Sequence, residues 1–577
     1  MLFIINNIYT FLQTDIITYC LSSIWIISFA LLFCYFFNKK IKDTLVLSFI
    51  VSFILLFFGG LIVNIYIFYF IGWLIIIIFY ILLIYNKKIV NLLKGIDIKT
   101  IIIYLVLSLF IFIYYQNVGF RFTDEFMHWG PMVKEMFKIN EFYCSNESLL
   151  LVHKDYPPFF SLIELLFCYF GRNYLEKYLY IGLLSFVSSI VISISFDRRN
   201  KIVSLIGLTL IGFIFQYIPS IQDNTSIYNS IYIDYALSLL FVYVITYLIS
   251  SKILDDFAYK KITLCFIALL LSKQIGILYF IICSVYLLFV IKKKSKNTFI
   301  CFVMPIVFFV IWEIVLKIYG ISGQFSISNF SFRTDSMSIL KVFLDAIINK
   351  PLFIKPISIN TLLVFISTVI ILLLSDKTKN KKITIVYGLG FFLYMFTICV
   401  LYMFVFSVEE AFILSSFERY IISYVYIGFA LITICICDLD KILPYFIYFV
   451  SVLLLSDIGN ANINKALDHK AILVINQQGA DVEFTNHTNG SFYSFDICEY
   501  LDESDIDLFK SKLNNYDYVY VYLYDGPFYT IWTELTNDHS LENDSLFYIN
   551  HENLAELQNS NFNMIYYVIK YSIKENE

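Results

Sequence analysis

Residues 68–86 read FYFIGWLIIIIFYILLIYN, an apolar run without one charged side chain. A helix needs about 20 such residues to cross a hydrocarbon core roughly 30 Å thick. Comparable runs recur through the first 457 positions, and hydrophobic residues make up 59% of all 577 positions against 15% charged ones. A soluble core needs far less apolar sequence than this. The sequence therefore predicts a mainly α fold, a polytopic bundle of membrane-spanning helices.

The lengths of the apolar runs predict about fourteen crossings, one of them short. The first run lacks the basic start and the small-residue cleavage site of a signal peptide, so we count it as a crossing. The predicted crossings are residues 16–37, 43–66, 68–86, 99–117, 178–196, 202–219, 231–250, 262–273, 275–291, 297–319, 359–375, 383–405, 418–437 and 442–457.

Lys and Arg gather in short links between these crossings, and such links stay in the cytoplasm. Counted along the chain, all of these links fall on one side of the membrane. The extracytoplasmic side then holds the loops 118–177, 220–230 and 320–358 and everything after residue 457. The basic links are residues 38–42, 86–99, 197–201, 252–261, 292–294 and 377–382.

The composition changes at about residue 458, where the tail carries 19 Asp and Glu against 6 Lys and no Arg. Three segments of this tail read as strands and two as helices. A segment of about 120 residues is large enough to fold alone. We predict a small soluble α/β domain over residues 458–577, outside the cytoplasm. The predicted strands are 471–475, 516–524 and 564–570, and the predicted helices are 504–513 and 552–558.

The loop 118–177 holds the most informative polar residues. Asp124 and Glu125 stand side by side just beyond a long apolar run, where carboxylates are costly to place and a functional role is the default hypothesis. They could instead solvate the loop, or supply first-turn charge to a helix from Glu125 to Phe137. Later in the same loop, Pro157 to Tyr169 is apolar but too short to span, which predicts an interfacial or re-entrant helix.

The order of several short motifs resembles the membrane-embedded GT-C glycosyltransferases. The resemblance is closest to the group of protein O-mannosyltransferases and lipid A aminoarabinose transferases. It covers roughly residues 99–457 in order and sidedness. The motifs are Asp124-Glu125, Tyr156-Pro157-Pro158 opening a short helix, Gly171, Leu271-Ser272-Lys273-Gln274 between two short apolar halves, and Glu418-Arg419-Tyr420 at the outer start of a late span.

Two features depart from the family pattern. Three or four spans precede the acidic loop, where the family core usually begins with one, so residues 1–98 look like an added N-terminal transmembrane module before a catalytic region over 99–457. Lys273 is followed by Gln274 and Ile275 instead of the Gly-Pro often seen there.

The resemblance implies a membrane glycosyltransferase that moves a sugar from a polyprenyl-phosphate-type lipid to an acceptor on the extracytoplasmic side, with inversion. Asp124 matches the catalytic acidic position of the family, so it is the candidate base for the acceptor proton. Glu125 could substitute for it or raise its pKa through like charge.

The leaving group of such a reaction is an anionic lipid phosphate, which calls for cations. Lys273 and Arg419 match the family's pattern of phosphate-binding residues, although both could be cations that snorkel to headgroups. His128 could bind phosphate when protonated, coordinate a divalent metal together with Asp124, or be an interfacial residue beside Trp129. The sequence identifies no definite cofactor, and it leaves open whether the reaction needs a divalent cation.

Four further residues are candidates for the wall of the substrate cavity: Tyr156, His153, Asp234 and Tyr420. His153 precedes the Tyr-Pro-Pro motif and could equally belong to a solvated loop. Asp234 lies just inside a span, where a carboxylate is expensive, which makes it a weaker candidate for contact with sugar or metal.

Two other classes of function compete with the transferase. A transporter or a flippase of lipid-linked glycans predicts broken helices with charges near the bilayer midplane, which the interrupted pair around Lys273 fits weakly. A non-catalytic scaffold gives no reason for Asp124, Lys273 and Arg419 to share one face. The expected partners are a polyprenyl-linked sugar donor, membrane lipids and a glycan, lipid or protein acceptor, without nucleic acid. The expected location is a bacterial cytoplasmic membrane.

Overall fold

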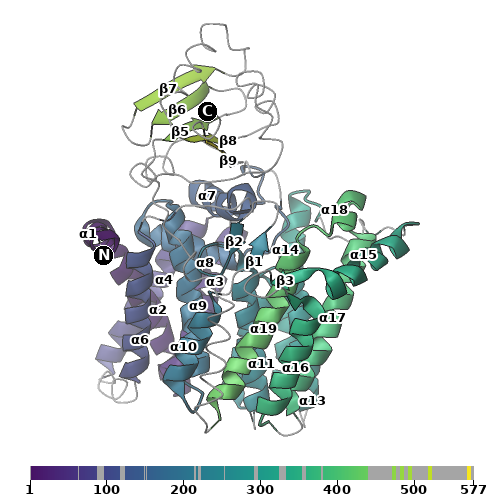
Figure 1. The fold of residues 1–577 in the computed structure, drawn as a ribbon. Helices are drawn as coiled ribbons and strands as arrows, with labels where there is room; N and C mark the ends of the chain where they lie inside the picture. The colour runs from purple at the N-terminus through teal and green to yellow at the C-terminus, as the bar shows by residue number, and fades with distance from the viewer. Residues whose placement is uncertain are drawn as a thin grey trace.

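The structure is a computed structural model whose described part is mostly helical (Figure 1). It describes residues 2–62, 64–86, 97–116, 118, 124–148, 150, 153–213, 216–218, 223–251, 254–290, 296–323, 330, 333–353, 359–378, 381–439, 471–475, 481–486, 491–496, 518–522 and 568–572.

Eight helices in this part of the chain are long and apolar enough to cross a membrane, which confirms the prediction of a multi-pass, mainly helical protein. Their length of 18 to 23 residues matches the thickness of a hydrocarbon core. They are α2 (Ile16–Phe37), α3 (Ile41–Leu61), α4 (Ile65–Tyr85), α9 (Glu176–Ser195), α11 (Ile233–Ser250), α14 (Lys296–Ile318), α17 (Lys382–Phe404) and α19 (Phe417–Cys437).

Five of the other predicted crossings also coincide with helices, but these helices are shorter than the eight. The run 202–219 is the clearest difference, because its helix ends at Ile211 and the chain then enters a hairpin. The crossing predicted at 442–457 lies outside the described residues. The shorter helices are α6 (Ile98–Tyr114), α10 (Lys201–Ile211), α12 (Asp256–Leu270), α13 (Gln274–Val290) and α16 (Thr361–Ser375).

The short segment after Pro157-Pro158 forms α8 (Phe159–Gly171), which begins after the two prolines as expected. Every residue from Phe159 to Phe170 is buried among neighbouring segments, so α8 is not exposed along its length, and its interfacial or re-entrant position in the membrane stays a prediction. The predicted helix from Glu125 is divided into a π-helical turn, η1 (Glu125–Trp129), and α7 (Gly130–Ile139). The remaining helices are α1 (Leu2–Thr14), α15 (Ser336–Asn349) and α18 (Val408–Ile413).

The described strands form two small hairpins and one five-stranded sheet. The hairpins pair β1 (Gln216–Ile218) with β2 (Asp223–Thr225) and β3 (Pro351–Phe353) with β4 (Ile359–Asn360). The sheet has the order β7-β6-β5-β8-β9, with β5 and β8 parallel and the other pairs antiparallel. Its strands are β5 (Ala471–Ile475), β6 (Asp481–Asn486), β7 (Ser491–Asp496), β8 (Tyr518–Tyr522) and β9 (Val568–Ser572).

Three of these strands fall within or overlap the strands predicted for the tail, whereas β6 and β7 lie in segments for which we predicted no element. The two helices predicted for the tail lie outside the described residues. The α/β class of this domain therefore stays a prediction.

One hydrophobic core runs through the bundle and includes helices from both sides of the predicted boundary at residue 98. Trp25 of α2 is fully buried, stacks on Tyr69 of α4 and meets Phe170 of α8 edge to face. Gly72 allows this packing, because a Cβ atom there would lie 2.0 Å from the Trp25 ring. Helices α3 and α8 both pack on α9, so α9 lies at the centre of this half of the bundle.

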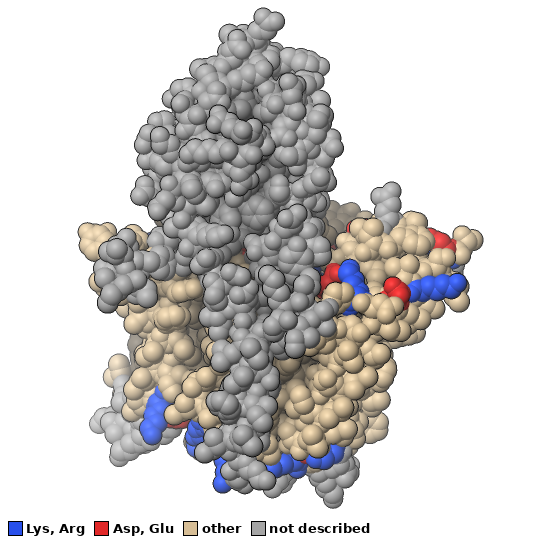
Figure 2. All heavy atoms as spheres, in the orientation of Figure 1, with Lys and Arg blue, Asp and Glu red and all other residues tan. Residues whose placement is uncertain are grey.

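The two ends of the bundle differ in charge. Figure 2 shows mainly Lys and Arg side chains along the lower end and a mixture of basic and acidic side chains at the upper right; α7, α15 and α18 lie at the upper end in Figure 1. Ion pairs join three of the predicted basic links to one another: Lys39 with Asp255 at 2.7 Å, and Lys42 with Asp197. These contacts bring the links 38–42, 197–201 and 252–261 to one end, as the count of crossings predicted.

Candidate active site

The acidic pair and the late-span arginine meet at the end of the bundle opposite the basic links. Asp124 is the last residue before η1, and Arg419 lies in the first turn of α19. The guanidinium of Arg419 donates from Nη1 to the Asp124 carboxylate and forms an ion pair with it. Both side chains are mostly shielded from solvent, with 23% and 14% of Asp124 and Arg419 exposed.

A second ion pair lies beside the first. Lys273 Nζ donates to Asp234 Oδ1 at 2.8 Å, and both side chains are at least nine-tenths buried. Asp234 comes from the first turn of α11, and Lys273 from the break between α12 and α13. Gly276 permits this break, since a Cβ atom there would lie 2.0 Å from the carbonyl oxygen of Leu269.

Aromatic rings connect the two ion pairs into one cluster. The ring of Tyr420 lies 5.9 Å from Lys273 Nζ and 5.7 Å from the Arg419 guanidinium carbon, so the two cations share one aromatic neighbour. Lys273 Nζ also lies 5.7 Å from Trp129, and the Arg419 guanidinium 5.2 Å from Tyr232. Such contacts stabilise cations in desolvated surroundings.

His128, His153 and Tyr156 form the aromatic side of the cluster. The ring centres of His128 and His153 are 4.5 Å apart, and Tyr156 lies 4.6 Å from His153 and 5.4 Å from His128. His153 adopts a φ of 57°, a left-handed conformation that is unusual for a non-glycine residue. The backbone N–H of Phe159 donates to the Leu271 carbonyl at 2.8 Å, which fixes this loop to the break that carries Lys273.

The charges of the cluster control the protonation of its groups. Burial alone would raise the pKa of Asp124, but the positive charges of Arg419 and Lys273 outweigh it and hold that pKa well below its ordinary value. Burial lowers the pKa of His128 well below its ordinary value, although Asp124 acts in the opposite direction. Burial likewise lowers the pKa of His153. At neutral pH the cluster therefore holds ionised Asp124 and neutral histidines.

Two polar atoms of the cluster have no hydrogen-bond partner among the residues that the structure describes. They are Nδ1 of His128 and Nε of Arg419, and both are buried. A buried polar atom without a partner costs about 1–3 kcal/mol, so such atoms are rare unless a ligand or water satisfies them. The cluster thus offers unused hydrogen-bonding capacity beside its two cations.

Glu125 occupies a different environment from its neighbour Asp124. Its carboxylate is fully buried, accepts hydrogen bonds from the Tyr180 hydroxyl at 3.0 Å and from the Ile231 backbone N–H at 2.6 Å, and so links η1 to α9 and to the start of α11. These contacts favour a structural role for Glu125 over the catalytic role that we expected from its position beside Asp124.

The structure brings together the other candidates, Asp124, His128, His153, Tyr156, Asp234, Lys273, Arg419 and Tyr420. Tyr232 was missed by sequence reasoning, although its place two residues before Asp234 at the start of a span was a usable signal. The described residues contain no group of three or more His, Cys, Asp or Glu side chains that could hold a metal ion, so Asp124 and His128 do not form one with a third ligand there.

No protein-family model matches this chain, and neither a curated protein nor a solved structure matches it. The chemistry of the cluster therefore has to be argued from its own residues.

Proposed function

We propose that this protein is a membrane glycosyltransferase of the GT-C type, which transfers a sugar from a polyprenyl-phosphate-type donor to an acceptor outside the cytoplasm. One observation supports this proposal most. Asp124, Lys273 and Arg419 come from three distant segments and meet in one buried cluster at the end of the bundle opposite the basic links.

The two cations would receive the donor phosphate. Lys273 and Arg419 are both compensated by carboxylates, Asp234 and Asp124, so the cluster carries no large net charge before the donor binds. A phosphate oxygen can take the place of a carboxylate at either cation, and it can also accept from the unused Nε of Arg419. The positive charge then lies where the leaving phosphate gains negative charge.

Donor binding would also activate the base. While Arg419 holds Asp124, the pKa of this carboxylate is too low for efficient proton transfer. Once phosphate competes for Arg419, that stabilisation weakens and the pKa of Asp124 rises toward a useful range. The acceptor oxygen then bonds to the anomeric carbon, the bond from this carbon to the phosphate oxygen breaks, and the acceptor proton moves to Asp124. One such displacement inverts the anomeric centre.

The rings around the cations suit a sugar. Trp129 and Tyr156 lie 5.2 Å apart next to Lys273 and His153, which provides apolar faces beside hydrogen-bonding groups. This combination of aromatic walls and few polar groups is typical of small-molecule sites.

The test is a transfer assay with purified protein and a panel of polyprenyl-phosphate sugars, following loss of sugar from the lipid. We expect Asp124→Asn to lower turnover by about 10²–10⁴-fold, the usual contribution of a general base. Asp335→Asn, at the N-terminus of α15, is a matched loss of one carboxylate at the same end and should leave turnover unchanged. Full turnover by a folded Asp124→Asn protein would remove this residue from the mechanism.

A transporter or a flippase of lipid-linked glycans is the second candidate. The break between α12 and α13 places a buried Lys273–Asp234 pair between two short helices, a feature of many transporters. In that case, liposomes with reconstituted protein would move the lipid-linked sugar between leaflets without breaking its glycosidic bond, and Asp124→Asn would leave this movement intact.

The kind of membrane and the orientation of the protein in it are also part of this proposal. The apolar helices are compatible with an integral multi-pass membrane protein. We propose that the membrane is a bacterial cytoplasmic membrane and that the cluster and the 458–577 domain face outward, where the domain would help to orient a glycan, lipid or protein acceptor.

A further inference from the structure

A second polar site lies at the basic end of the bundle, which is the end opposite the cluster around the Asp124–Arg419 and Asp234–Lys273 ion pairs. A cavity of about 460 Å³ opens there between the start of α6 and the turn that joins α9 to α10. Its polar rim consists of Lys99, Arg199, Lys201, Asp97 and Asn200. Its floor is apolar and includes Ile103, Phe196 and Leu205.

The rim is positively charged. Three cations face one carboxylate, and Asp97 is partly engaged because its Oδ2 accepts from the Thr100 hydroxyl at 2.9 Å. Lys99, Arg199 and Lys201 are exposed at their ends and lie next to the first turns of α6 and α10. Helix N-termini add partial positive charge to the same region. The rim therefore suits a group with negative charge.

A second, apolar cavity lies further along the same three helices. It has a volume of about 280 Å³ and is lined by residues such as Leu107 of α6, Val191 of α9 and Thr209 of α10. The last residues that line the first cavity are Ile103 on α6 and Leu205 on α10. The second cavity begins four residues further along each helix, at Leu107 and Thr209, a distance of roughly 6 Å. We refer to the two cavities, which share no lining residue, as one groove along α6, α9 and α10, with a charged mouth and apolar walls.

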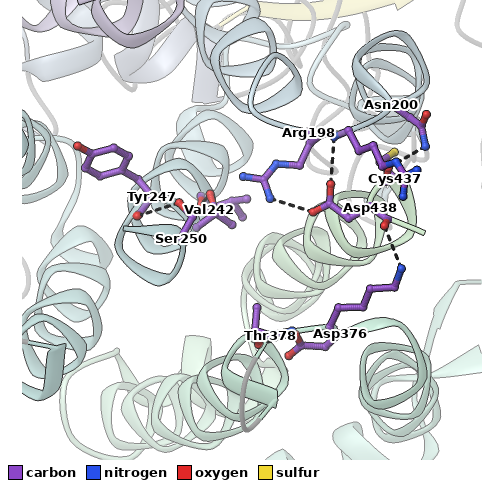
Figure 3. Close-up of polar contacts among 12 residues, drawn as sticks. Arg198, Asn200, Val242, Tyr247, Ser250, Asp376, Thr378, Cys437 and Asp438 are labelled. Atoms are coloured by element: carbon purple, nitrogen blue, oxygen red, sulfur yellow. Dashed lines mark hydrogen bonds and ion pairs between the residues drawn. The ribbon is translucent and has the colours of Figure 1, made fainter. Parts of the chain in front are cut away.

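The mouth of this groove is held in place by the end of α19. Arg198 donates to the Asp438 carboxylate at 3.2 Å, and the Asn200 side chain donates to the Cys437 carbonyl at 3.0 Å, as Figure 3 shows. The Arg199 backbone N–H donates to the same Asp438 carboxylate at 3.2 Å. Because Arg198 is turned toward α19, Arg199 and Lys201 remain as the basic residues of this turn that line the cavity.

We propose that this groove binds an anionic glycerophospholipid from the leaflet at the basic end of the bundle. Its phosphate would lie between Lys99, Arg199 and Lys201, and one acyl chain would run along α6, α9 and α10. Basic pockets between membrane helices commonly bind anionic headgroups. A free phosphate would satisfy the rim but leave the apolar groove unused, which is why we commit to a lipid.

The experiment measures lipid binding to the full-length protein by native mass spectrometry after detergent exchange. Dioleoyl phosphatidylglycerol and dioleoyl phosphatidylcholine are added in separate titrations. We expect the anionic lipid to bind more tightly, and the triple variant Lys99→Gln/Arg199→Gln/Lys201→Gln to lose about 100-fold of that affinity, since each cation near an anionic headgroup contributes about fivefold.

The matched control is Lys40→Gln/Lys260→Gln/Lys296→Gln, which removes three exposed cations that do not line the cavity. It should bind the anionic lipid as the unmodified protein does. Leu205→Trp fills the apolar floor without changing charge and should also weaken binding, so the proposal remains testable if the triple variant does not fold. Equal affinity for the two lipids, equal loss in the control, or full competition by 10-fold excess glycerol phosphate would overturn it.

Discussion

Asp124 and Arg419 form an ion pair although they lie 295 positions apart in the chain. The pair joins a short turn after the early spans to the first turn of a late one. A flexible pair at the surface would contribute about 0–1 kcal/mol. Here desolvation makes each partner depend on the other, so a ligand that competes for Arg419 changes the properties of Asp124 at once.

Arg419→Lys tests this coupling. Lysine keeps the positive charge but lacks the planar guanidinium. It can therefore contact a phosphate oxygen or Asp124, but it cannot form the paired hydrogen bonds that arginine makes with either group. We expect KM for the lipid donor to rise by about 10-fold or more, with a smaller loss in kcat, because one charge-assisted hydrogen bond of about 1.5–3 kcal/mol is lost. Steady-state kinetics with the polyprenyl-phosphate sugar measures both constants. An unchanged KM would exclude Arg419 from donor binding.

Lys273 and Asp234 predict a stability effect. Lys273→Met leaves the Asp234 carboxylate buried without its cation, and breaking a buried pair in this way costs about 3–5 kcal/mol. Lys273→Met/Asp234→Asn removes both charges and should recover most of that loss. Thermal unfolding in detergent gives the comparison. If the double variant is as unstable as the single one, the cost comes from lost packing and not from the unpaired charge.

Acid should destabilise the protein through its histidines. Burial depresses the pKa of His128 and of His153 in the folded state, so below the ordinary pKa of about 6.5 the unfolded chain binds protons that the folded one does not. Stability is then unaffected above pH 6.5 and falls as pH drops below it, by at most about 1.4 kcal/mol per pH unit for each histidine.

His128→Asn should therefore flatten the dependence of Tm on pH between about 6.5 and 5. Asp124 contributes in a separate window, because its depressed pKa gives stability that persists above the ordinary value near 3.8 and is lost only at lower pH. An identical pH profile in His128→Asn and the unmodified protein would mean that His128 is protonated in the folded state.

Glu125 should behave as a structural residue. Tyr180→Phe removes the hydroxyl that donates to its carboxylate at 3.0 Å but leaves the Ile231 N–H in place. We expect a loss of stability of about 1–3 kcal/mol, with turnover per folded molecule nearly unchanged. Unfolding and transfer assays on the same preparation separate the two effects. A loss of turnover as large as that of Asp124→Asn would place Glu125 among the reacting groups instead.

The sequence predicts which segments form helices better than it predicts which side chains contact one another. Long apolar runs predict membrane helices, because few other structures satisfy that many apolar side chains, and positions 16–37 and 233–250 illustrate this. Asp124 stands out because a carboxylate beside an apolar run is costly, whereas Lys273 and Arg419 stand out only through motifs that resemble those of the GT-C group. Their pairing was not predictable, since Lys273 meets Asp234 only through the packing of α11 against the α12–α13 break.

Neighbouring residues also received different environments for local reasons. A regular helix would place Asp124 and Glu125 about 100° apart, but whether the second carboxylate faces the cluster or the core depends on the π-helical turn η1 and on Tyr180 of α9. Likewise, α8 is apolar except for Ser161 and Glu164, a pattern that fits both a helix at the membrane surface and a buried one until its neighbours are known. Composition alone cannot decide between them.

The orientation of the bundle gives the last prediction. The link 38–42, which carries Lys39 and Lys42, should face the cytoplasm together with the links 197–201 and 252–261 that it contacts, because short basic links are retained there. In a Cys20→Ser/Cys498→Ser background, which removes an exposed thiol of α2 and the cysteine of the 458–577 segment, Lys40→Cys and Thr334→Cys each add one thiol at an exposed position, at the two ends of the bundle.

A membrane-impermeant maleimide added to intact cells should label Thr334→Cys and should reach Lys40→Cys only after the membrane is opened. The positive charge of the links sets this sidedness, so the reverse pattern would place the Asp124–Arg419 pair in the cytoplasm. There it could not act on an extracytoplasmic acceptor. The cluster would lie on the wrong side of the membrane for the proposed transfer reaction, even if every contact in it were correct.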